Sequence, residues 1–145
     1  MPVKQIHDRD QLHSFLSKDP VGCAYQLGDL DEAYFPWCNW WGCFDDMGGL
    51  EHVFLLYRGL SIPVALTCGI SRSLGSLLPE LIERLPNRFY CQIWEDHFEQ
   101  MRAHYDLSNL QAVQRMSVKK EAFKGVERDK SVVRLGHRDT GQIME

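Results

Sequence analysis

Apolar side chains recur at helical spacing between Leu74 and Leu85, and this stretch constrains the fold more than any other part of the chain. They fall at relative positions 0, 3, 4, 7, 8 and 11, namely Leu74, Leu77, Leu78, Leu81, Ile82 and Leu85. That spacing places them on one face of an α-helix. Pro86 is expected to end this helix, and Pro79 is expected in its first turn, where proline is tolerated.

Two apolar runs precede this helix and predict a β-hairpin. They are His52 to Arg58 and Pro63 to Gly69, with Gly59-Leu60-Ser61 between them. The remaining elements are expected as strands at Val3 to Ile6, Arg88 to Trp94 and Leu110 to Val118, and as helices from Asp8, over Ala24 to Leu30 and over Phe98 to Tyr105. Asp8 and Gln11 have capping-box spacing. Together these elements predict an α/β fold, a mixed α+β sandwich with a central mixed sheet flanked by helices.

Charge and composition exclude several classes of protein. The 145 residues carry a net charge of -4 without a basic stripe, which disfavours a nucleic-acid partner. No apolar run approaches the roughly 20 residues that a membrane span needs, and the N-terminus has no apolar signal-peptide core. Five cysteines, an odd number without a C-x-x-C pair, favour reduced thiols and a cytoplasmic location.

The segment from Tyr34 to Phe44 is rich in aromatic residues. An aromatic clamp for a ligand is one interpretation, and core packing is the favoured one, because aromatic side chains bury large apolar areas. Cys38 and Cys43 lack a matching pair of histidines, so no metal site is predicted. His97 and His104 are seven residues apart, which is also not the spacing of a metal-binding helix.

The C-terminal residues predict a domain junction. A strand is expected at Ser131 to Leu135, followed by a helix start that ends after about one turn, which is unstable in isolation. The segment Val133 to Ile143 also echoes Val3 to Leu12. We therefore expect one domain over residues 1–130, and the start of a truncated second domain or a frayed tail over residues 131–145.

The expected order of elements resembles that of the GNAT N-acyltransferase superfamily. The segment from Val64 to Leu85 resembles the strand, loop and helix with which that family binds the pyrophosphate of acyl-CoA. The family pattern Q/R-x-x-G-x-G/A is matched by Arg72 and Gly75, but Leu77 stands where Gly or Ala is expected. The resemblance implies acetyl-CoA or another acyl-CoA as cofactor, held by Ile70, Ser71, Arg72, Gly75 and Ser76. Helix capping by serine explains the same residues.

A second segment, Tyr105 to Leu110, resembles the family's Y-x-x-x-G-F pattern, with Asn109 in place of Gly. The resemblance implies that Tyr105 acts as a general acid toward the leaving thiolate, whereas helix-end packing is the alternative. The stretch from Tyr25 to Trp41 and Gly42, continued by Leu55 to Arg58, is similar to the first, degenerate half of two-domain GNAT-like proteins.

Two functions follow as expectations. In the first, the chain is the non-catalytic N-terminal half of a GNAT-like acyltransferase, whose partners are a second GNAT-like domain and a small-molecule amine. In the second, it is a GNAT-fold module that binds a ligand or protein and has no acyltransferase activity. A homodimer through an exposed aromatic face is a further partner hypothesis.

Overall fold

The computed structural model describes residues 2–124. Residues up to Arg115 form one compact unit, and a second unit begins at Met116, of which the described part contains one short 3-10 helix, Lys120–Ala122. The strand expected at Ser131 to Leu135 and the domain start expected at residues 131–145 lie outside the described residues, so the predicted domain boundary stays a prediction.

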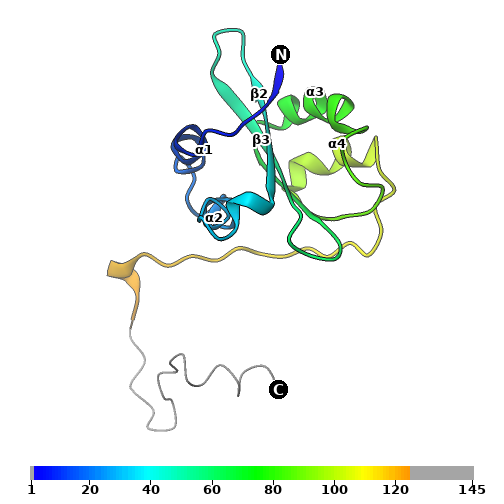
Figure 1. The fold of residues 1–145 in the computed structure, drawn as a ribbon. Helices are drawn as coiled ribbons and strands as arrows, with labels where there is room; N and C mark the ends of the chain where they lie inside the picture. Colours follow the sequence, from blue (N-terminus) through cyan, green and yellow to red (C-terminus); the bar gives the residue numbers. More distant parts are fainter. Residues whose placement is uncertain (1, 125–145) are drawn as a thin grey trace. The chain divides into compact units, whose positions relative to one another are not determined.

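A five-stranded mixed sheet forms the centre of the first unit (Figure 1). Its strands, in spatial as well as chain order, are β1 (Val3–Gln5), β2 (Cys38–Phe44), β3 (Leu50–Tyr57), β4 (Val64–Gly69) and β5 (Tyr90–Gln92). The first three pairings are antiparallel, and β4 pairs with β5 in parallel. The helices are α1 (Arg9–Leu16), α2 (Ala24–Gly28), α3 (Ser71–Leu81) and α4 (Phe98–Arg102), with 3-10 turns η1 (Phe35–Trp37) and η2 (Glu95–His97). This architecture confirms the expected α/β class.

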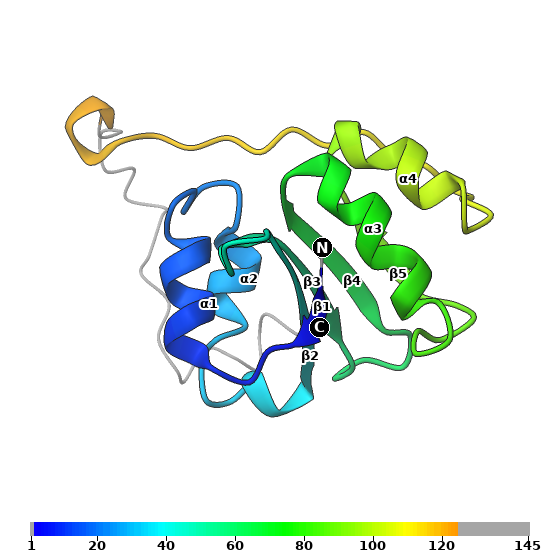
Figure 2. The same ribbon diagram turned by 90° about the horizontal axis from the view of Figure 1, so that it is seen from above.

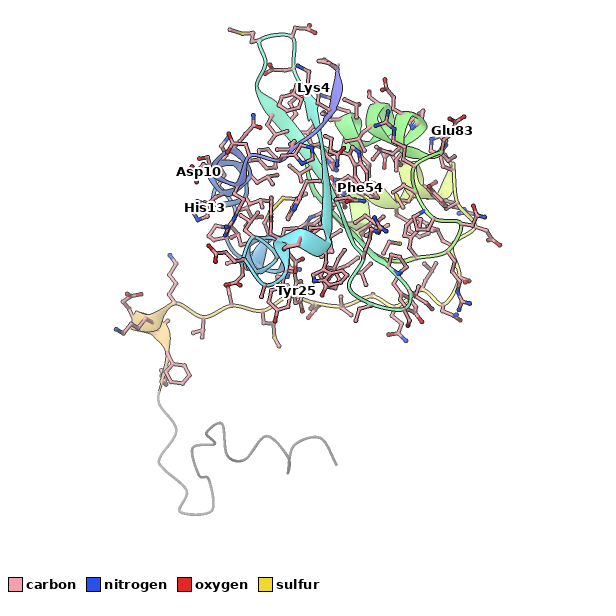
Figure 3. The ribbon with its side chains drawn as sticks, in the orientation of Figure 1. Lys4, Asp10, His13, Tyr25, Phe54 and Glu83 are labelled. Carbon is pink, nitrogen blue, oxygen red and sulfur yellow. A yellow bond between two sulfur atoms is a disulfide. The ribbon has the colours of Figure 1, made fainter. Side chains whose placement is uncertain are left out.

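Helices cover both faces of the sheet, with α1 and α2 on one side and α3 and α4 on the other (Figure 2). The alternation of side chains along β3 supplies both cores. Val53 and Leu55 join the core under α1 and α2, whereas Phe54 and Leu56 join the core under α3 and α4. Exposed residues of the helices, such as Asp10 on α1 and Tyr25 on α2, lie on the outer surface (Figure 3).

The aromatic segment is divided between core and surface. Trp40, Trp41 and Phe44 are buried, as core packing predicts, while Tyr34 and Trp37 are exposed. Side chains alternate along β2, so Trp40 and Trp41 enter the two opposite cores. The exposed pair precedes the strand and leaves part of the aromatic surface open to solvent.

Helix α1 begins as the capping pattern predicts. The Asp8 carboxylate accepts hydrogen bonds from the backbone N–H groups of Asp10 and Gln11, at 2.9 and 3.1 Å. Helix α3 differs from expectation because it begins at Ser71 and ends at Leu81. Pro79 therefore lies in the last turn of α3 and not in its first turn. In this position proline cannot donate a backbone hydrogen bond to the Gly75 carbonyl.

The strand expected from Leu110 to Val118 is wrong. The described chain forms no strand there, and Leu110 and Val113 are 63% and 73% exposed. A strand needs a neighbouring strand to satisfy its backbone groups, and this segment has none among the described residues. Instead, the Arg115 guanidinium donates hydrogen bonds to the Val21 and Gly22 carbonyls and lies over the rings of Tyr25 and Trp94.

The expectation of fully reduced thiols is also wrong. Cys23, which immediately precedes α2, is joined by a disulfide to Cys68 of β4, across 45 residues of sequence. Both cysteines lie in the core between α2 and the sheet. An apolar run around a cysteine predicts that it is buried, but not which other cysteine lies beside it. Cys38, Cys43 and Cys91 are free thiols. Within residues 2–124, no helix has the length and apolar character needed to cross a membrane.

Candidate functional site at the end of strand β4

Strand β4 extends beyond its parallel partner. The pairing with β5 covers Val64 to Leu66 and stops where Leu66 faces Gln92, yet β4 continues to Gly69. The backbone groups of residues 67–69 on the β5 side of β4 therefore need other hydrogen-bond partners, because a buried unpaired carbonyl is costly. An unpaired strand edge of this kind is also a place where an extended ligand can bind through its own polar groups.

The imidazole of His97 occupies this edge. Its Nδ1 lies 2.8 Å from Thr67 Oγ1, and its Nε2 lies 3.3 Å from the Gly69 carbonyl oxygen. Because a carbonyl only accepts, Nε2 carries the proton and donates to Gly69, while Nδ1 accepts from the Thr67 hydroxyl. The His97 side chain is fully buried, and burial is the main cause that lowers its pKa.

Gln26 reaches the same edge from α2. Its side-chain Nε2 donates to the Thr67 carbonyl at 3.3 Å, and the residue is buried. The Cys23–Cys68 disulfide also links the start of α2 to β4. Cys23 is three residues before Gln26, and Cys68 follows Thr67 directly. The carbonyls of Thr67 and Gly69 are thus both satisfied by side chains of the protein itself.

His52 lies beside His97, with ring centroids 5.0 Å apart in an edge-to-face arrangement. Its Nδ1 donates to the Ile70 carbonyl at 3.1 Å, and its Nε2 has no hydrogen-bond partner within residues 2–124. Burial, and secondarily the neighbouring His97, lower the pKa of His52 to about 3. The two buried imidazoles are therefore neutral near physiological pH.

The bend that follows β4 depends on Gly69. Its φ is +121°, and a Cβ at this position would lie 2.3 Å from the backbone oxygen of Glu51. That distance is well inside van der Waals contact with backbone, which cannot move aside easily. Gly69 therefore lets the chain turn from β4 toward α3 while it stays close to β3.

Glu51 of β3 lies at the beginning of α3. One carboxylate oxygen accepts a hydrogen bond from Ser73 Oγ at 2.6 Å, and the other lies 3.4 Å from the Arg72 guanidinium. The Glu51 side chain is only 14% exposed. A negative charge is favourable beside the N-terminus of a helix, and this is the position in which a helix can otherwise receive a phosphate.

The predicted phosphate-binding residues lie at and after this point. Ile70 is the N-cap of α3 and is exposed, Ser71 is its first residue, and the Ser76 side chain is exposed. Gly75 faces α4, since a Cβ added to it would lie 3.7 Å from Gln100. Leu77, which departs from the family pattern, is fully buried in the core under α3.

Tyr105 lies with another part of the molecule. Its ring packs edge-on against Phe89 at 5.1 Å, and it contributes to a cavity of about 560 Å³ that Phe98 and Arg102 also line. Its hydroxyl is buried without a hydrogen-bond partner in the described part of the chain, and burial raises the pKa of the phenol. Asn109, which stands in place of Gly in this pattern, has a positive φ of 54°, a conformation that Asn tolerates better than most residues. The general-acid role of Tyr105 stays a prediction.

Sequence reasoning missed most of this polar cluster. Gln26, Glu51 and Thr67 carry no motif, and His52 sits inside an apolar run. His97 was considered only with His104, which is exposed beyond the end of α4. The feature of the sequence that could have indicated the cluster is the presence of polar residues within apolar segments. Such residues are expected to be buried, and buried polar groups need hydrogen-bond partners. Residues 2–124 contain no group of three or more metal-ligating side chains placed to hold an ion.

Comparison with known proteins adds no relative: no protein-family model, no curated protein and no solved structure matches this chain.

Proposed function

We propose that this chain is a GNAT-like domain that does not bind acyl-CoA, and that it serves as the non-catalytic N-terminal half of an acyltransferase. The other half would transfer an acyl group from acyl-CoA to a small-molecule amine. The observation that carries the proposal is that the chain's own side chains occupy the polar groups at the end of β4 and at the start of α3.

The arrangement of the elements supports the resemblance to the GNAT superfamily. Two helices separate β1 from β2, an antiparallel meander follows, and α3 connects β4 to the parallel strand β5. This is the expected order as far as α4, with β2 as an additional strand, whereas the last strand of that order, expected at Leu110 to Val118, does not form. Fold alone does not establish an activity, so the activity rests on the site.

The charge at the start of α3 opposes a pyrophosphate. The Glu51 carboxylate already interacts with Ser73 and Arg72, the cation that the family pattern would direct to the ligand. An incoming pyrophosphate would meet this negative charge at short range in a partly buried place, where like charges repel strongly. Binding would require Glu51 to leave or to become protonated.

The edge of β4 opposes the rest of an acyl-CoA molecule. Gln26 and His97 donate to the Thr67 and Gly69 carbonyls, so an extended ligand would have to displace both. The same burial keeps His52 and His97 away from an amine substrate, although a general base must reach the proton that it removes. These observations support a domain without its own catalytic step.

Isothermal calorimetry with acetyl-CoA and with free CoA tests the proposal. We expect no binding in the micromolar range by residues 1–145, and binding by a longer chain that includes the following domain. Arg72→Ala is the matched variant, because it removes the only cation of the predicted phosphate site. Micromolar binding by residues 1–145 that Arg72→Ala abolishes would refute the proposal.

The second candidate is a binding module without any acyltransferase partner. The exposed aromatic side chains of Tyr25, Trp37 and Trp94 favour it, because Trp and Tyr are enriched in binding surfaces. Failure of both the short and the longer chain to bind CoA would support this candidate. A cytoplasmic location is part of the first proposal, although the Cys23–Cys68 disulfide opposes it, because disulfides are rare in the cytosol.

A further inference from the structure

The outer edge of β5 has no strand partner among the described residues. β5 is the last strand in the order of the sheet. The backbone N–H of Tyr90 donates to the Pro63 carbonyl, at 2.9 Å, and so points toward β4. Because backbone groups alternate along a strand, those of Cys91 point away from β4, toward the open edge.

This edge has one of the features that limit edge pairing, because β5 is only three residues long. Natural edge strands are also protected by charged side chains, proline or bulges. The run from Phe89 to Trp94 contains neither charge nor proline, and the Tyr90 side chain is 61% exposed. The opposite edge of the same sheet is protected, since β1 contains Lys4 and follows Pro2. The composition of this run therefore does not oppose pairing with another strand.

The charges at the ends of this run identify the occupant. Arg88 precedes it, and Glu95 and Asp96 follow it, all three exposed. Two copies that pair antiparallel bring the Arg88 end of one copy beside the acidic end of the other, while the uncharged run places no like charges opposite each other. Parallel pairing would set like charges side by side.

We propose that β5 pairs antiparallel with β5 of a second copy of this chain, about a two-fold axis, so that one sheet continues through both copies. Residues directly opposite each other in an antiparallel pair have the same backbone orientation. The axis therefore passes Cys91 or Gln92, each facing its own counterpart. In the first register, Tyr90 faces Gln92 of the partner subunit. The interface is isologous, as in most homodimers.

Analytical ultracentrifugation of residues 1–145 tests this proposal. The expected mass is twice the 16.8 kDa of one chain. A Tyr90→Lys/Gln92→Lys variant places lysines opposite each other in both registers. We expect its dissociation constant to rise by up to about fivefold in the register with one lysine pair, and by more in the register with two. Tyr90→Glu/Gln92→Glu should dissociate in the same way. Tyr34→Lys, at an exposed aromatic residue outside the sheet, is the control and should stay dimeric.

Mixing the lysine variant with the glutamate variant provides the decisive result. Opposite charges then face each other, so the mixture should form a heterodimer at a concentration at which each variant alone is monomeric. Misfolded variants would not regain association on mixing, which separates a lost interface from a lost fold. A monomeric parent chain at all concentrations, variants as dimeric as the parent, or a mixture that stays monomeric would each overturn the proposal.

Discussion

Acid should destabilise this protein through His52, because its imidazole is held neutral in the folded state. Burial lowers the pKa of His52 from the ordinary 6.5 to about 3. Below pH 6.5 the unfolded chain therefore binds a proton at this residue that the folded protein does not. The free energy of unfolding consequently falls as the pH falls, from about pH 6.5 down to about pH 3.

The size of the effect follows from the two pKa values. At pH 5 the unfolded histidine is almost fully protonated and the folded one almost fully neutral. Linkage then predicts that His52 alone removes about 2 kcal/mol of stability between pH 7 and pH 5. His97, whose pKa is also lowered mainly by burial, changes stability in the same direction.

Urea unfolding at both pH values, on the parent chain and on His52→Asn, measures the contribution. The asparagine side-chain N–H can replace Nδ1 as the donor to the Ile70 carbonyl, but it does not titrate. We expect the variant to be less stable at pH 7, because it loses ring packing, and to lose about 2 kcal/mol less than the parent between the two pH values. Exposed histidines and carboxylates cancel in this comparison. Equal losses in parent and variant would refute the assignment of a neutral, buried His52.

Two further predictions concern the end of β4. Titration of thiols in unfolded, non-reduced protein should find three free cysteines, because Cys23 and Cys68 are paired. Reduction of this disulfide should lower the midpoint of thermal unfolding. Five free thiols in protein purified from the cytoplasm would contradict the pairing and support the cytoplasmic location. Gly69→Ala should destabilise the fold by at least about 1–3 kcal/mol in chemical unfolding, because it combines a positive φ with a backbone clash. Gly48→Ala is the control, since Gly48 has a positive φ with open space around it. If both variants lose the same stability, the backbone clash does not explain the effect at Gly69.

Local sequence patterns predicted the elements, and they failed where the outcome depended on distant neighbours. The capping of α1 by Asp8 and the hairpin of β3 and β4 are local, since a side chain and its partners lie within a few residues. The segment after Leu110 has a composition typical of a strand, but a strand forms only beside another strand. The disulfide likewise depends on the packing of α2 against β4, which no spacing of cysteines reveals.

The candidate site was harder to predict because its polar groups come from elements far apart in sequence. The departure of Leu77 from the family pattern directs attention to α3, and the structure adds a different physical reason for the proposed loss of acyl-CoA binding. Leu77 is a core residue, so Leu77→Ala would cost about 2–5 kcal/mol of stability and would leave the Glu51 carboxylate beside Ser73. Gln26 and His97 would still occupy the edge of β4. If the proposed loss of acyl-CoA binding is correct, it is distributed over these elements, and no single substitution at the motif would restore it.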